Sequence, residues 1–134
     1  MFCLVYASAG TQKWSRTEVE SMLAGFRENN ASLDVTGLLL YNEGSFIQVL
    51  EGDESVVLDL YHKIERDERH HLVTVMLEMP TEQRSFPDWS MGFRVLDSSS
   101  GIVPEGLKTF RQALEGKLDP HGVIDFVRTF AQGM

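Results

Sequence analysis

The segment with the sequence SFIQVLEG, residues 45–52, constrains the fold of this chain more than any other. Its aromatic and β-branched residues favour a β-strand that ends at Gly52. Because apolar residues hardly alternate with polar ones, we expect both faces of this strand to be covered, as in the middle of a sheet. Gln48 lies within the apolar run, and burying its amide unpaired would cost about 1–3 kcal/mol. The segment therefore predicts polar partners for Gln48 inside the core.

Length and composition are those of one globular domain. The chain has 134 residues, of which 43% are hydrophobic and 24% charged, enough for a single core. Its net charge of −8 argues against nucleic acid or an anionic membrane as a partner. The single cysteine, Cys3, cannot form an intrachain disulfide and suits a reducing compartment. Because neither a signal peptide nor a membrane-spanning run is recognisable, we expect a cytoplasmic protein.

Five segments have the composition and patterning of β-strands. They are residues 2–8, 35–42, 45–52, 72–79 and 89–95. The sequence NEG at residues 42–44 is typical of a tight turn, so the second and third strands should form a hairpin. Gly37 predicts a close approach of two strand backbones.

Two helices are expected between these strands. The first starts at a capping box formed by Ser15 and Glu18 and ends near residues 29–30. The second has Asp53 as its cap, and its apolar stripe runs to Ile64. We interpret residues 65–70 as the charged, solvated end of this helix. Two short helices should follow the linker at residues 97–101, the second of them capped by Asp119.

The order β-α-β-β-α-β-β predicts an α+β fold, a ferredoxin-like sandwich with an added fifth strand. We expect two helices on one face of a five-stranded mixed sheet. Two short C-terminal helices would cover the other face, unless a second subunit does so. Residues 1–97 would then form the main domain, and residues 98–134 a helical extension that packs on the sheet.

Two polar residues are candidate partners of Gln48. Tyr6 lies in the first strand, which neighbours the third in a ferredoxin-like sheet, and Asn30 lies at the end of the first helix. The three side chains could simply satisfy one another, as most buried polar groups do. The histidines lack the spacing of zinc ligands, and the glycines do not form a phosphate-binding loop. From these residues alone, a small ligand-binding module or enzyme stays open.

Six short motifs follow one another between residues 5 and 91. They are VYAS at 5–8, NN at 29–30, VTGLLLY at 35–41, FIQVLEG at 46–52, DERH at 67–70 and FPDWSM at 86–91. Each motif is weak evidence alone. Together, and at this spacing, they resemble the BLUF domains, blue-light sensors that bind flavin adenine dinucleotide (FAD) non-covalently.

The resemblance implies a role for individual residues of this chain. Tyr6 corresponds to the photochemical tyrosine, and Gln48 to the glutamine whose hydrogen bonding switches after light-driven electron and proton transfer from tyrosine to flavin. Trp89 and Met91 correspond to a signalling pair on the fifth strand. The implied flavin contacts are Asn30, Phe46, Gln48, Ile64, Asp67, Arg69 and His70.

The resemblance also implies a sensor rather than an enzyme. The residues after the fifth strand are too few for a cyclase or phosphodiesterase domain. We therefore expect the signal to pass to a partner protein, or through a change in self-association, by way of the C-terminal helices. The alternative is a ferredoxin-like ligand-binding module or enzyme without photochemistry. Such a module has no reason to combine Tyr6, Asn30, Gln48 and Arg69.

Overall fold

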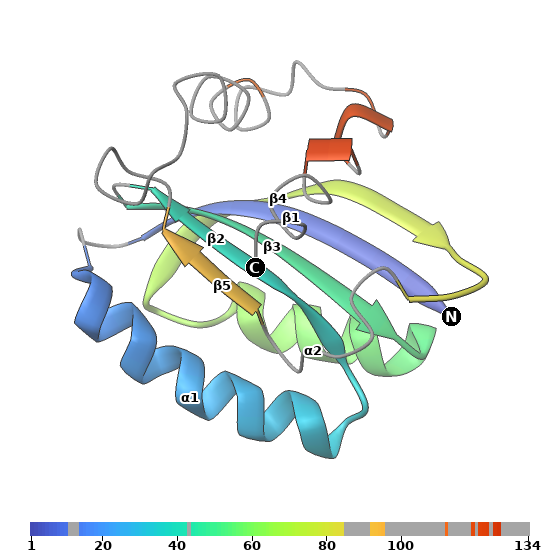
Figure 1. The fold of residues 1–134 in the computed structure, drawn as a ribbon, viewed down its shortest axis with the longest axis horizontal. Coiled ribbons are helices and arrows are strands. Elements are labelled where there is room, and N and C mark those ends of the chain that lie inside the picture. Colours follow the sequence, from blue (N-terminus) through green and yellow to red (C-terminus); the bar gives the residue numbers. More distant parts are fainter. Residues whose placement is uncertain are drawn as a thin grey trace.

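The computed structural model has the element order β-α-β-β-α-β-β over residues 2–95 (Figure 1). It describes residues 1–10, 14–42, 44–84, 92–95, 112, 119, 121–123 and 125–126. The elements are β1 (Phe2–Gly10), α1 (Arg16–Ser32), β2 (Thr36–Asn42), β3 (Ser45–Gly52), α2 (Glu54–Glu65), β4 (His70–Pro80) and β5 (Gly92–Val95). This order confirms the predicted α+β class and fits a ferredoxin-like arrangement.

The strands form one sheet in the order β4-β1-β3-β2-β5. β3 pairs antiparallel with β1 on one side and with β2 on the other. β1 also pairs antiparallel with β4, and β5 runs parallel to β2. Every residue of β3 after Ser45 is buried. The central position of β3 explains why its apolar residues do not alternate with polar ones.

α1 and α2 lie on the same face of the sheet (Figure 1). The core on this face joins Leu23 of α1 and Val57 of α2 to Leu50 of β3. Because residues two apart in a strand share a face, Gln48 also points toward the helices. Gln48 therefore lies on the face of the sheet that α1 and α2 cover.

The start of α1 follows the predicted capping box. The Ser15 hydroxyl accepts a hydrogen bond from the Glu18 amide at 3.2 Å, and the Glu18 carboxylate accepts one from the Ser15 amide at 3.2 Å. The end of α1 lies at Ser32, beyond the predicted end at residues 29–30. The amide of Leu33 still reaches the carbonyls of that segment, so the last turn stays closed.

Two predictions about α2 are wrong in part. Asp53 occupies the N-cap position, but its side chain makes no capping hydrogen bond. Its carboxylate accepts a hydrogen bond from the Ser55 hydroxyl at 2.7 Å. The helix also ends at Glu65, so residues 66–69 form a turn instead of a helical tail. β4 then begins at His70, two residues before the predicted start of the strand.

β2 and β3 pair as the predicted hairpin. Gly37 lies where the two backbones leave no room for a side chain. A Cβ atom built on Gly37 would lie 1.8 Å from the carbonyl oxygen of Val49. The expected close approach at Gly37 is therefore confirmed.

The face of the sheet away from α1 and α2 is buried as well. Val5, Leu38, Ile47 and Val49 are each at most 1% exposed. These residues lie on β1, β2 and β3, so the three central strands are covered on both sides. None of the described helices is long and apolar enough to cross a membrane.

The structure describes only parts of the predicted C-terminal helices. Asp119 caps the second one, since its carboxylate accepts a hydrogen bond from the amide of Gly122 at 2.7 Å. Val123 and Phe126 in this helix are buried. The other residues of the two helices lie outside the described ranges, so the extension over residues 98–134 stays a prediction.

Candidate functional site

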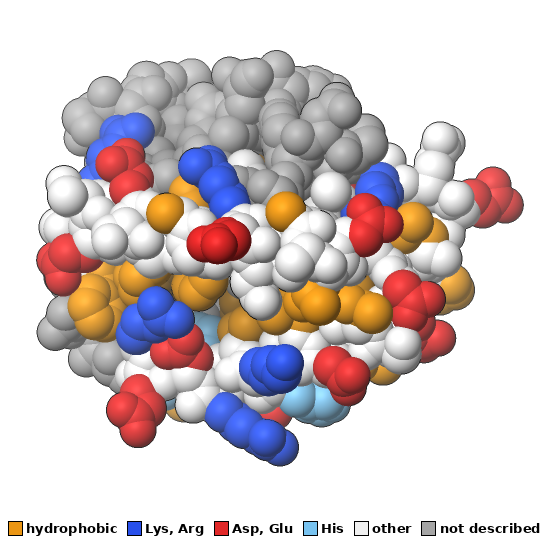
Figure 2. Space-filling view, turned by 90° about the horizontal axis from the view of Figure 1, so that it is seen from below, with side chains coloured by type: hydrophobic (Ala, Val, Ile, Leu, Met, Phe, Trp, Pro, Cys, Tyr) orange, Lys and Arg blue, Asp and Glu red, His pale blue; other side chains and the backbone are white. Residues whose placement is uncertain are grey.

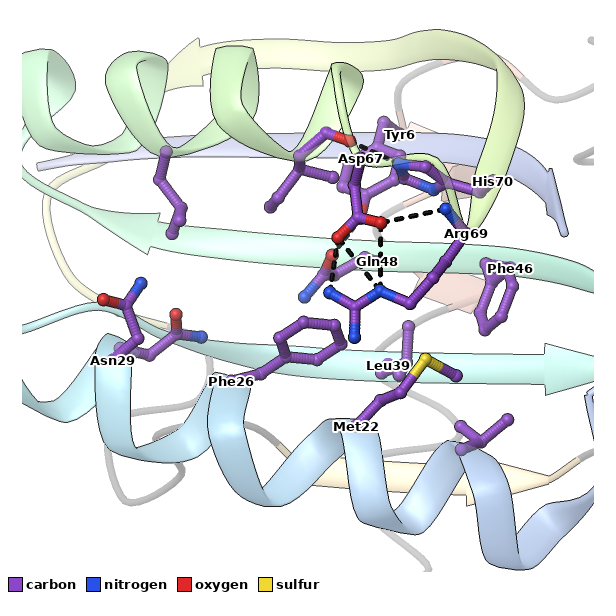
Figure 3. A pocket seen from close by; sticks show the side chains of 14 residues that line it. Tyr6, Met22, Phe26, Asn29, Leu39, Phe46, Gln48, Asp67, Arg69 and His70 are labelled. Atoms are coloured by element: carbon purple, nitrogen blue, oxygen red, sulfur yellow. Dashed lines mark hydrogen bonds and ion pairs between the residues drawn. The ribbon is translucent and has the colours of Figure 1, made fainter. Parts of the chain in front are cut away.

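A cleft opens between α1, α2 and the centre of the sheet (Figure 3). It encloses about 600 Å³ of space, its open mouth included. The residues that line it are Tyr6, Val19, Met22, Phe26, Asn29, Asn30, Leu39, Phe46, Gln48, Leu60, Ile64, Asp67, Arg69 and His70. The cleft therefore brings together every predicted site residue from Tyr6 to His70. On the molecular surface, hydrophobic side chains gather in a band between charged groups (Figure 2).

Tyr6 and Gln48 meet on the floor of the cleft. They are directly opposite each other in the pairing of β1 with β3, and the Tyr6 hydroxyl donates a hydrogen bond to Gln48 Oε1. The two side chains are 3% and 4% exposed. Burial, with the charges of Tyr61 and Asp67 nearby, raises the pKa of the Tyr6 hydroxyl above its ordinary value. Tyr6 is thus a protonated donor, and Gln48 its acceptor, at neutral pH.

The last turns of α1 place two neighbouring amide side chains, Asn29 and Asn30, against the cleft. Asn30 is 3% exposed. Its backbone carbonyl accepts a hydrogen bond from the amide of Val35 at 2.9 Å, which ties the end of α1 to the start of β2. Asn29 has no role in the sequence interpretation, although it lines the same wall.

The turn between α2 and β4 places a charged pair in the cleft. The Arg69 backbone amide and Nε each donate to Asp67 Oδ1 at 2.9 Å, and Nη2 donates to Oδ2 (Figure 3). These hydrogen bonds lower the pKa of Asp67 and raise that of Arg69. The Arg69 guanidinium lies 5.1 Å from the ring centre of Phe26, a cation–π distance. A cationic donor therefore spans from this turn to α1.

Trp14 holds this turn to the start of α1. Its indole Nε1 donates to the backbone carbonyl of Arg69 at 3.1 Å. Its own backbone carbonyl accepts a hydrogen bond from the Tyr41 hydroxyl at 2.7 Å. Trp14 thereby connects the Asp67–Arg69 pair to β2.

His70 bridges α2 and β1 beside Tyr6. Its Nε2 lies 2.5 Å from the carbonyl oxygen of Ile64, and its Nδ1 lies 2.9 Å from the Ser8 hydroxyl. Because a carbonyl can only accept, the neutral ring carries its proton on Nε2 and accepts from Ser8 at Nδ1. The ring stands edge-on to Tyr6, with 6.1 Å between ring centres.

Sequence reasoning missed most of the apolar walls of the cleft. Met22 and Phe26 lie on one face of α1, four positions apart, at the helical spacing that is typical of residues packed in the core. Periodicity shows that such residues face inward, but it does not show that the space in front of them is open. Trp89 and Met91 lie outside the described residues, so their predicted signalling role is untested.

The chain belongs to the BLUF family. The family model, described as sensors of blue-light using FAD, matches residues 1–92. This match covers more than half of the chain and includes all the cleft residues.

Relatives and solved structures agree with this assignment. The photoactivated adenylate cyclase subunit beta of Euglena longa is 36% identical over 89 residues, which are 66% of this chain and 10% of that protein. The blue light- and temperature-regulated antirepressor BluF of Escherichia coli (strain K12) is 35% identical over 95% of this chain and 32% of its own length. The dark-state structure of BlrB, a BLUF protein, has a TM-score of 0.82 at 27% identity and covers 99% of this chain and 96% of its own.

The residues of the cleft fit the cofactor of the family. A flavin ring system has an apolar dimethylbenzene end and a polar edge of carbonyls and ring nitrogens. The cleft offers apolar walls from both helices and the sheet, and the amides and the guanidinium are the donors that such an edge requires. Among the described residues, no group of histidine, cysteine and acidic side chains could hold a metal ion.

Proposed function

We propose that this chain is a blue-light photoreceptor that holds FAD non-covalently in the cleft, with Tyr6 and Gln48 as its light-responsive pair. The observation that carries the proposal is the buried hydrogen bond from the Tyr6 hydroxyl to Gln48 Oε1. A member of this family needs an oxidisable side chain next to a polar group that can change state. The floor of the cleft supplies both.

The polar and the apolar residues of the cleft would contact different parts of the flavin. Asn30 and Gln48 supply amide groups for the polar edge, and Arg69 supplies a cationic donor held in place by Asp67. The apolar walls cover the ring faces and exclude water. The proposed contacts are Asn30, Phe46, Gln48, Ile64, Asp67, Arg69 and His70.

The bound flavin supplies absorption of blue light and, once excited, strong oxidising power. A tyrosine that loses an electron has a strongly acidic hydroxyl, and Gln48 Oε1 already accepts the Tyr6 proton in a hydrogen bond. A glutamine amide that takes up this proton, or turns about its last torsion angle, exchanges a donor for an acceptor at the same place. Gln48 thus has two hydrogen-bonding states, and the change between them is the primary signal.

We also propose that the domain is a sensor without catalytic activity, whose output passes to a partner protein or through self-association. The family description as sensors supports the first part. The cyclase subunit and the antirepressor are much longer than the segment they share with this chain. The shared segment is therefore only a minor part of each of these proteins. The alternative is a ligand-binding module or enzyme without photochemistry.

Absorption spectroscopy of the purified protein tests the proposal. We expect a yellow protein that gives a small red shift under blue light and recovers in the dark. Gln48→Leu and Tyr6→Phe should stay yellow and lose the normal shift. Gln83→Leu is the matched control, because Gln83 is exposed and outside the cleft. A chain that cannot be loaded with flavin contradicts the cofactor, and a full shift in either cleft variant contradicts the assigned pair.

A further inference from the structure

Arg84 lies in the connection from β4 to β5, outside the cleft, and binds two other segments. Its side chain is only 14% exposed. Nη1 donates to the Thr36 hydroxyl at 2.8 Å and to the backbone carbonyl of Glu51 at 3.0 Å, and Nη2 donates to the backbone carbonyl of Asp34 at 2.6 Å. The planar guanidinium has five donors in a fixed fork, so it can hold several acceptors at once.

The two segments that Arg84 binds are those that carry the buried amides of the cleft. Glu51 follows Gln48 on β3. Asp34 follows Asn30 in the turn after α1, where the amide of Val35 donates to the Asn30 carbonyl at 2.9 Å. Arg84 therefore connects the Gln48 strand, the end of α1 and the chain that leads to β5.

The strength of this connection comes from the carbonyls. Hydrogen bonds from a cation to a carbonyl are stronger than those between neutral groups. Nη2 also lies 3.1 Å from the Asp34 carboxylate, but that side chain is 95% exposed, so water screens the ion pair. β2 and β3 also pair directly, Thr36 with Glu51, so a neutral or shorter side chain at position 84 would not separate them. It would lose the charge-assisted hydrogen bonds that hold Arg84 to the carbonyls of Asp34 and Glu51.

We propose that Arg84 is a positioning residue that transmits the change at Gln48 to β5. The strand pairing also links Gln48 to β5. Leu39 of β2 pairs with Gln48 of β3 on one side and with Phe93 of β5 on the other. β2 therefore joins the Gln48 strand to β5, and Arg84 holds the end of this pair of strands to the connection that precedes β5. This inference rests on the photoreceptor function proposed above.

Amide hydrogen exchange in the flavin-loaded protein, in light and in darkness, tests the role of Arg84. We expect the wild type to show a light-minus-dark difference in β5, and Arg84→Gln to keep the colour and red shift but lose this difference. Arg16→Gln removes a charge from an exposed side chain, and this variant should keep the light-minus-dark difference in β5. If Arg84→Gln does not fold, Arg84→Lys keeps the charge without the fork and should show a reduced difference.

Several outcomes would overturn this role. One is a β5 difference of wild-type size in Arg84→Gln or, where that variant does not fold, in Arg84→Lys. Such a difference would overturn the role even if the variant exchanges faster than the wild type in darkness. Faster exchange in darkness with an unchanged light-minus-dark difference would mean that Arg84 only stabilises the fold. A wild type that shifts to the red without any difference in β5 would overturn it as well. A wild type without a red shift would instead refute the photoreceptor function.

A second readout needs no flavin. In the flavin-free protein, Arg84→Gln should shift the side-chain amide NMR signals of Gln48 and Asn30, and Arg16→Gln should leave them in place. Unchanged signals in Arg84→Gln would refute the positioning role independently of any photochemistry.

Discussion

Replacing Gly37 with alanine tests how the sheet beneath the cleft is built. The new Cβ would lie 1.8 Å from the carbonyl oxygen of Val49 and 2.8 Å from its carbonyl carbon. Both are main-chain atoms of β3, so neither can move away by a side-chain rotation. The shorter contact falls about 1.2 Å below the 3.0 Å limit that real Cβ contacts respect. In Gly37→Ala, the backbones of β2 and β3 must therefore move apart near Gly37 and Val49.

The expected cost is the sum of strain and weakened hydrogen bonds. Forcing extra atoms into a packed core costs about 1–3 kcal/mol. Each ladder hydrogen bond that the separation weakens contributes about 1 kcal/mol net. We expect Gly37→Ala to lower the free energy of unfolding by about 3–5 kcal/mol, a large part of the roughly 5–15 kcal/mol typical of a domain.

Urea denaturation followed by circular dichroism measures this loss. Gly25→Ala is the matched control, because nothing lies within 4 Å of a Cβ at Gly25 in α1. Alanine is the better helix former, so this variant should gain about 0.5–1 kcal/mol. A Gly37→Ala protein within about 1 kcal/mol of the wild type would refute the close approach, since that is the size of an ordinary surface effect.

The pKa shifts in the cleft lead to two predictions at the extremes of pH. Hydrogen bonds from Arg69 hold the folded pKa of Asp67 below its ordinary 3.8, so their stabilisation is present above that value and is lost as the pH falls through the folded pKa. Denaturation between about pH 5 and pH 2 should therefore show a smaller loss of stability in Asp67→Asn than in the wild type, and equal losses would contradict the pair. Burial raises the pKa of Tyr6 above its ordinary 10.0, so the unfolded chain loses this proton first and stability falls as the pH rises above about 10. Tyr6→Phe should reduce that fall, whereas parallel stability curves for variant and wild type would show that Tyr6 is not the buried phenol.

Local chemistry was predictable wherever the interacting groups are close in the chain. The capping box of α1 needs only Ser15 and Glu18, three positions apart, and the structure shows both hydrogen bonds. The hairpin and the extent of β3 followed from the turn and from the apolar run. Asp53 shows the limit of such reasoning, because it occupies the N-cap position of α2 without the expected side-chain capping hydrogen bond.

The composition of the candidate site was predictable only in part. A buried glutamine requires polar partners, so Gln48 could be singled out from the sequence, and Tyr6 could be named as a partner once the sheet order was assumed. The walls from Met22 and Phe26 could not be separated from ordinary core residues. Their periodicity is the same whether a neighbouring side chain or an open cleft lies in front of them.

The sequence by itself determined the order of β1 to β5, α1 and α2 and their approximate positions, and that Gln48 must be satisfied inside the core. Only the tertiary structure decided which groups meet. The register of β1 against β3 sets Tyr6 opposite Gln48, the sheet order sets β5 beside β2, and Arg84 binds carbonyls far away in the chain. The physical reason is that periodicity and propensity act over a few residues, whereas these contacts depend on how whole strands and helices pack together.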